Sequence, residues 1–198
     1  MKFIRYLGQA FISVYYDITQ LILVNILWVL MTLPVITAPG ALAGLFYAMN
    51  KLAKNEPVQR QTFFEGFQKY FWLSWRWALL NMIVLYVAYL NFEFYRKAAG
   101  NNIQWIAGIV IGLIFIWVVM QIFIWPLLIE QNEKRILVAI RQCVLLFFRH
   151  PGPIYLIAIM SFLLSLISVW LLGLPWLIFM GSFCAYFSSA TILYVLSD

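Results

Sequence analysis

Four long apolar stretches, residues 18–49, 72–92, 103–129 and 154–196, dominate this chain. Within them the charged residues are confined to Arg76, and only 10% of the whole chain is charged. Soluble domains are about a quarter charged. A helix needs about 20 apolar residues to cross a hydrocarbon core of about 30 Å. The second and third stretches each hold one such crossing and the fourth is long enough for two, so the pattern predicts a multi-pass membrane protein.

The expected fold is all-α, a polytopic transmembrane helical bundle that forms a single membrane domain over residues 1–198. Backbone polar groups have no water to bind inside a bilayer, which favours helices over open strands. A transmembrane β-barrel would show alternating segments of about 10 residues, whereas these stretches are continuously apolar.

Proline and glycine predict how the first and last stretches divide. Pro34 and Pro39-Gly40 interrupt the first stretch, and residues 173–175 (Gly-Leu-Pro) interrupt the last. Such residues end helices and permit tight reversals. Two hairpins give six crossings in all. The limb over residues 41–52 reaches only about 18 Å, so it either starts earlier and crosses fully or is re-entrant; five crossings are the alternative.

The basic residues predict an orientation in the cell membrane. With six crossings, 11 of the 13 lysines and arginines lie on one face, in the N-terminal tail, residues 51–76 and residues 134–149. Positive charge in short loops marks the cytoplasmic side, so both termini are expected to be cytoplasmic, with Arg96 and Lys97 outside. Five crossings would place the N-terminal tail outside.

The three basic segments also carry a helical apolar pattern. In the third segment it runs through Ile136, Ile140, Val144 and Phe147, one face of an α-helix. Related patterns in the N-terminal tail and in residues 63–75 predict amphipathic helices in the plane of the cytoplasmic surface. The chain then divides into a three-fold quasi-repeat, 1–58, 59–130 and 131–198. Alternatively, any basic helix beside a span has this pattern without duplication.

Polar residues inside the apolar stretches are the default functional candidates in a membrane protein. Hydrogen bonding between helices is the favoured explanation for them, and a ligand route is the alternative. Trp105 and Trp125, 20 residues apart, are expected to bracket one span at the two interfaces. The intramembrane candidates are Asn25, Asn81, Gln121, Ser161, Ser165 and Ser168.

Small and basic residues supply two further candidate sets. The pairs Gly40/Gly44 and Gly108/Gly112 follow the G-x-x-x-G pattern, and Gly181 and Ala185 share a face, so all six are expected to pack helices closely. The basic cytoplasmic segments are expected to contact anionic lipid or a partner protein. The residues assigned to these contacts are Arg76, Lys134, Arg135, Arg141 and Arg149.

No motif predicts a catalytic residue, a cofactor or a metal site. His150 is the only histidine, and Cys143 and Cys184 do not form a spaced pair. Serine hydrolase, phosphate-loop and H-E-x-x-H patterns are absent from the sequence. The net charge of +6 fits basic membrane loops better than nucleic-acid binding.

Residues 33–47, LPVITAPGALAGLFY, followed by residues 63–71, FFEGFQKYF, resemble the YesL family of small bacterial integral membrane proteins of unknown function. The chain departs from the family pattern at Ala38-Pro39-Gly40, where the family usually has Gly-Pro, and at Tyr70, often Asn. The resemblance covers the first half well and the rest mainly by layout. It implies an accessory role in carbohydrate utilisation and transfers no catalytic residue.

Two functions are therefore expected. The first is a non-enzymatic accessory protein that contacts a transporter or sensor subunit of a carbohydrate-uptake system. The alternative is a small carrier or channel for a neutral solute, lined by the intramembrane polar residues.

Overall fold

The computed structural model describes residues 2–97, 104–171, 173 and 175–197, and all regular structure within these ranges is helical. The predicted all-α fold is thus confirmed for the described part of the chain. The elements are α1 (Lys2–Tyr16), α2 (Ile18–Thr32), α3 (Ala38–Ala53), α4 (Arg60–Lys97), α5 (Gln104–Glu130), α6 (Ile136–Arg149), α7 (Pro151–Trp170), the π-helix η1 (Trp176–Met180) and α8 (Gly181–Ser197).

The structure contains helices that are long and apolar enough to cross a membrane, which supports the prediction of a membrane protein. Among the described residues there are four such segments, and α1 with α2, joined by a bend of 76°, would make a fifth. At 16 residues, α3 is about 24 Å long and shorter than a hydrocarbon core. The predicted count of six is therefore not confirmed. The four segments are Arg60–Lys97, Trp105–Glu130, Pro151–Ser168 and Ile178–Ser197.

The first apolar stretch divides at Pro34, as predicted. The chain leaves α2 after Thr32, and the Thr37 hydroxyl donates to the carbonyl of Pro34 at 2.8 Å. Pro39-Gly40 was predicted as part of the interruption, and this is wrong, because both residues lie in the first turn of α3. A proline is compatible with a first helical turn, where its missing N–H has no intrahelical partner.

The last apolar stretch also reverses where expected. After α7, Gly173 adopts a left-handed φ of 75°, and its N–H donates to the carbonyl of Ser168 at 2.8 Å. Glycine adopts this conformation without steric cost. Leu174, the middle residue of the predicted reversal, lies outside the described residues.

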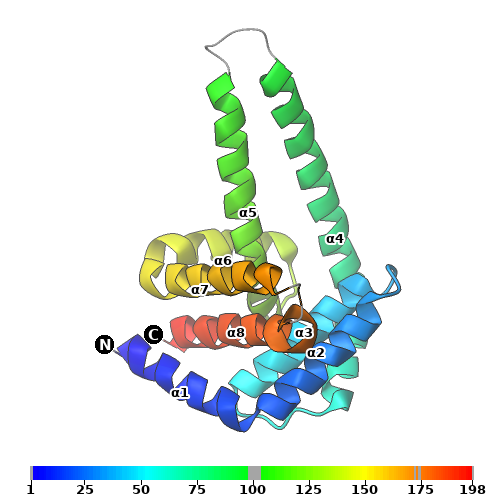
Figure 1. Ribbon diagram of the computed structural model, residues 1–198, viewed down its shortest axis with the longest axis vertical. Coiled ribbons are helices and arrows are strands. Elements are labelled where there is room, and N and C mark those ends of the chain that lie inside the picture. Colours follow the sequence, from blue (N-terminus) through cyan, green and yellow to red (C-terminus); the bar gives the residue numbers. More distant parts are fainter. Residues whose placement is uncertain (1, 98–103, 172, 174, 198) are drawn as a thin grey trace.

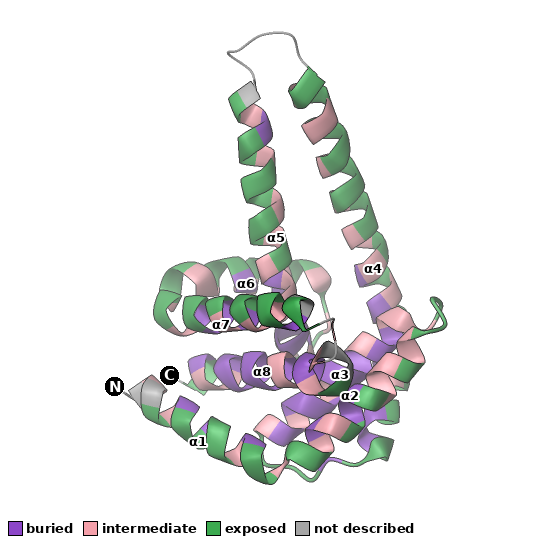
Figure 2. Cartoon of the chain, in the orientation of Figure 1, coloured by how far each residue is buried: buried purple, intermediate pink, exposed green. Residues whose placement is uncertain are grey.

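The centre of the molecule is built on α3 and α8, in which most residues are buried (Figure 2). Alanine and glycine make up much of α3, so neighbouring helices approach it closely. Gly40 lies against the rings of Phe67 and Phe71, and Gly44 against Phe63. This contact places the first half of α4 on α3.

That contact corrects the prediction for the middle amphipathic segment. Instead of a separate in-plane helix followed by a span, α4 is one continuous helix of 38 residues. Its apolar Phe63–Phe67–Phe71 face packs on the small residues of α3. The amphipathic pattern is real, but a protein helix covers this face.

The outer half of α4 and the first half of α5 form an arm that projects from the body along the long axis of the molecule (Figure 1). In the same view α6, α7 and α8 run across the arm, so the helices do not form one parallel bundle. Most of the arm surface is exposed and apolar (Figure 2).

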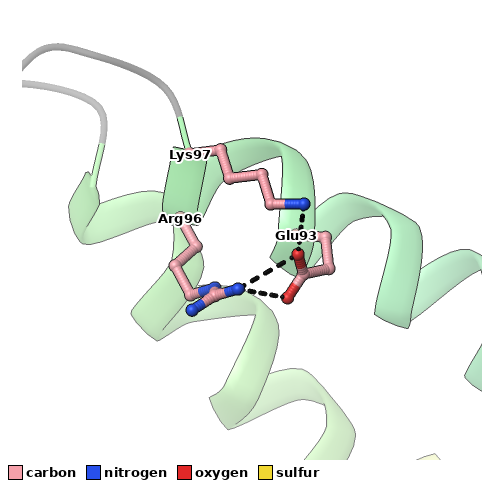
Figure 3. Close-up of polar contacts among 3 residues, drawn as sticks. All are labelled: Glu93, Arg96 and Lys97. Atoms are coloured by element: carbon pink, nitrogen blue, oxygen red, sulfur yellow. Dashed lines mark hydrogen bonds and ion pairs between the residues drawn. The ribbon is translucent and has the colours of Figure 1, made fainter.

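Near the end of the arm, Glu93 pairs with both basic residues that were predicted to lie outside (Figure 3). Its carboxylate accepts from Arg96 at 2.9 Å and lies 2.9 Å from the Lys97 ammonium. These spacings of three and four residues place the charges on one face of α4. Glu93 therefore offsets part of the positive charge at this end.

The first and third amphipathic segments are helices, as predicted. In α1 the face with Leu7, Ala10 and Val14 is buried, and the Phe11 ring lies 4.6 Å from that of Phe187 in α8. In α6 the side chains of Ala139 and Cys143 are buried, whereas Leu137 and Phe148 are exposed. Their placement at a membrane surface and the three-fold quasi-repeat stay predictions.

Candidate functional site

At the base of the arm, two of the predicted intramembrane amides bind each other across α4 and α5. The Gln121 Nε2 group donates to Asn81 Oδ1 at 2.8 Å. The indole N–H of Trp117 donates to the same oxygen at 2.9 Å, and that of Trp77 donates to Gln121 Oε1 at 3.1 Å. The Asn81 amide also donates to the Trp77 carbonyl at 2.9 Å. We call Trp77, Asn81, Trp117 and Gln121 the amide–indole network.

The amide–indole network is largely closed. Both amide oxygens accept hydrogen bonds and both amide nitrogens donate them, while the two indole rings lie 5.7 Å apart. Buried polar groups need partners of this kind because unpaired groups are costly in an apolar environment. The predicted interhelical hydrogen bonding of Asn81 and Gln121 is thus confirmed.

Asn25 lies apart from this network, at the contact of α2 with α8. It is fully buried, and its Oδ1 accepts from the backbone N–H of Ser182 at 2.9 Å. Ser182 is the second residue of α8, which directly follows η1. Asn25 therefore binds the beginning of the central helix.

The predicted serine stripe is divided in the structure. Ser161 and Ser165 line a cavity of about 520 Å³ between α5 and α7, beside Cys184 of α8, and the rest of its wall is apolar. Ser168 is fully buried but does not line this cavity. The predicted polar residues thus occupy separate contacts instead of one common surface.

The glycine pairs differ in what surrounds them. Gly40 and Gly44 pack against α4, as described above, and a Cβ at Gly181 would lie 2.6 Å from the Trp28 ring and 2.9 Å from Asn25 Oδ1. These three close contacts were predicted. At Gly108 and Gly112, a Cβ would meet no atom within 4 Å, so this pair packs no helix of the described chain.

Close packing was also expected at Ala185, which is buried in α8. A further close contact was not predicted: at Gly66 in α4, a Cβ would meet Tyr47 of α3 at 2.5 Å.

The predicted basic contacts are mostly at the surface. Arg76, Arg141 and Arg149 are exposed, and Arg135 pairs with Glu133 at 2.7 Å. Lys134 instead folds inward, and its ammonium donates to the carbonyl of Ile129 at 2.6 Å and to that of Gln131.

Sequence reasoning missed Trp77 and Trp117 as partners of the two amides. A signal was present, because each tryptophan precedes its amide by four residues, in Trp77–Asn81 and Trp117–Gln121. Residues spaced by four lie on the same face of a helix. Two such pairs on neighbouring spans are suited to bind each other.

Within the described ranges, no group of three or more histidine, cysteine, aspartate or glutamate residues is placed to hold a metal ion. Residues 21–92 match the sequence model of a family described as protein of unknown function, DUF624. This stretch includes both blocks that carry the YesL-type resemblance, and the match is consistent with it. No curated protein and no solved structure matches the chain.

Proposed function

We propose that this protein is a non-enzymatic accessory subunit of a membrane transporter or sensor in a carbohydrate-uptake system. In this proposal the arm binds a transmembrane helix of the partner. The single observation that carries the proposal is the unoccupied G-x-x-x-G face of α5. Gly108 and Gly112 leave open space at the surface of the arm, and such pairs let two helices approach closely in a membrane.

The geometry of α5 supports this assignment. Trp117, which binds α4, lies nine residues after Gly108 and thus about 180° around the helix. The glycine face therefore points away from α4 and is free to receive a helix from another chain. Around it, Ile109 and Phe115 are about half exposed.

The intramembrane amides support the same assignment. Asn81 and Gln121 bind each other and the two indoles, and Asn25 binds the backbone of α8. Amides engaged in this way hold helices together, and few of their hydrogen-bonding groups remain available to a solute. The carbohydrate context comes from the YesL-type resemblance.

The double variant Gly108→Leu/Gly112→Leu tests this proposal. Filling both open positions should abolish recovery of a transporter or sensor subunit with the protein, because the added side chains keep the partner helix at a distance. The measurement is affinity purification in mild detergent from cells grown on the inducing sugar, with the bound subunits identified by mass spectrometry.

The matched control is Gly8→Leu. Gly8 is also exposed within a helix and has open space at its Cβ position, but it lies in α1. Partner recovery should persist in this variant. Recovery of the unmodified protein alone, or equal loss in both variants, contradicts the proposal. If cross-linking yields only homodimers, the helix that binds the glycine face comes from a second copy of this chain.

A carrier or channel for a neutral solute is the second candidate, favoured by the cavity that Ser161 and Ser165 line. The largely apolar wall of that cavity gives a sugar or another polar solute few hydrogen-bonding groups. Uptake by vesicles that contain only the purified protein, lost in Ser161→Leu, would establish the carrier and exclude the accessory assignment.

We further propose the orientation that the charge pattern predicts, with both termini at the cytoplasmic side of the cell membrane and α2 and α3 as two short crossings that complete six. A reporter fused after Ser197 should report cytoplasm, and one fused near Gly100, which lies outside the described residues, should report the exterior. A reporter fused after Ile36 distinguishes six crossings, which place it outside, from four. An exterior C-terminus would contradict the orientation.

A further inference from the structure

Three lysines converge on a pair of tyrosines where α3, α4 and the α5–α6 connection meet, and the charge of a fourth lysine acts on one of them. Tyr47 and Lys51 belong to α3, and Lys69 and Tyr70 belong to α4. Lys54 follows the end of α3, and Lys134 lies between α5 and α6. We call Tyr47, Lys51, Lys54, Lys69, Tyr70 and Lys134 the lysine–tyrosine cluster.

The two tyrosine rings form the base of this cluster. Their centroids lie 5.8 Å apart, and Tyr70 is buried. The ammonium of Lys69 lies 5.4 Å from the Tyr47 centroid and 5.5 Å from the Tyr70 centroid. Lys51 lies 5.1 Å from Tyr47, and Lys134 lies 5.9 Å from Tyr70. Three ammonium groups from three segments are thus held over one pair of rings.

The positive charges of the cluster exceed its negative charges. Glu65 lies 3.5 Å from Lys51, and Glu130 lies 2.7 Å from Lys54. Two carboxylates therefore accompany four ammonium groups. Lys134 uses the neutral carbonyls of Ile129 and Gln131 as acceptors, and Lys69 lies over ring faces.

The excess of positive charge affects the protonation of Lys134. Its pKa is lowered, first by burial and then by the positive charge of Lys69 and of Lys54, although Glu130 acts in the opposite direction. A lowered lysine pKa means that the charged form is disfavoured at this position. A bound anion would reverse that effect and stabilise the charged cluster.

We propose that the lysine–tyrosine cluster is a binding site for a phosphate group, with Lys69 and Lys134 as its principal ligands. Phosphate presents several acceptor oxygens around one centre, so it can bind ammonium groups from different segments at once. Lysine acts toward phosphate as a mobile point charge on a flexible stem. The group can belong to the headgroup of an anionic lipid or to a soluble phosphate ester.

The test uses the full-length protein in nanodiscs, with two probes. One is inorganic phosphate added to nanodiscs of phosphatidylcholine alone, followed by calorimetry. The other is phosphatidic acid at one part in ten of the same lipid, with the retained molecules counted by native mass spectrometry. Binding of the first probe identifies a site open to soluble phosphate, and binding of the second identifies a lipid headgroup site.

Lys69→Gln should weaken binding of the effective probe by about tenfold, and the double variant Lys69→Gln/Lys134→Gln by about a hundredfold, since each change removes a charge-assisted contact. The matched control is Arg5→Gln/Arg60→Gln, which removes two positive charges from exposed positions outside the cluster. Its effect should stay within about twofold, because solvent and salt screen exposed charges.

Lys69 is exposed, so its single variant is expected to fold even if the double variant does not. The proposal is overturned if neither probe binds the unmodified protein. It is also overturned if Lys69→Gln leaves binding unchanged, or if the arginine control loses as much affinity as the lysine variant, which would indicate a diffuse basic surface.

Discussion

Gly66→Ala should destabilise the protein by about 2–3 kcal/mol, the cost of forcing extra volume into a well-packed contact. A Cβ at Gly66 would lie 2.5 Å from the Tyr47 Cβ and 2.7 Å from two further atoms of that side chain. The Cβ of Tyr47 is fixed by its backbone, so rotation of the ring cannot remove the closest clash. Relief requires α3 and α4 to move apart.

The measurement is the melting temperature in mild detergent, followed by tryptophan fluorescence, with an expected fall of about 5–10 °C. Gly8→Ala is the matched control, since Gly8 is an exposed helical glycine with open space around its Cβ position. That change should leave the melting temperature unchanged or raise it slightly, because alanine favours a helix. Equal melting temperatures for both variants would contradict the close contact of α3 with α4.

Much of the fold could be predicted because it depends on local signals. Proline disfavours helical backbone at the residue before it, in agreement with the end of α2 just before Leu33-Pro34. The helical period of α1 and α6 is evident from their own residues. Hydrogen bonding of Asn81 and Gln121 to a neighbouring helix could also be predicted, since an amide inside a span needs a hydrogen-bond partner.

The rest depends on which helices approach each other, and local patterns do not determine that. Phe63, Phe67 and Phe71 form an apolar stripe that suits a membrane surface as well as it suits α3. Trp125 was predicted at an interface, yet it is buried and stacks on Phe46 with ring centroids 6.4 Å apart. The closeness of Gly66 to Tyr47 likewise had no signal, because Gly66 is not part of a G-x-x-x-G pair.

The amide–indole network gives the second large expected effect. Asn81→Leu removes the acceptor of both the Trp117 indole and the Gln121 amide. Gln121→Leu removes the acceptor of the Trp77 indole. Each change should destabilise the protein by about 1–2 kcal/mol, near the upper end measured for polar contacts between membrane helices. The double variant should lose less than the sum of the two, because the partners left unpaired by one change are absent after the other.

Asn91→Leu is the control for this cycle. Asn91 is exposed on the same helix, and its amide donates to the Val87 carbonyl of its own turn. Its replacement should leave the melting temperature nearly unchanged. Additive losses at Asn81 and Gln121 would contradict the network.

The cycle also bears on function. A coupled network means that α4 and α5 are fixed to each other at the base of the arm, as a subunit that presents a rigid helix face to a partner requires. A carrier would need the same amides to exchange protein partners for solute during transport. Strong coupling that is unchanged by added sugars would therefore favour the accessory function, whereas coupling that disappears when a sugar is present would favour the carrier.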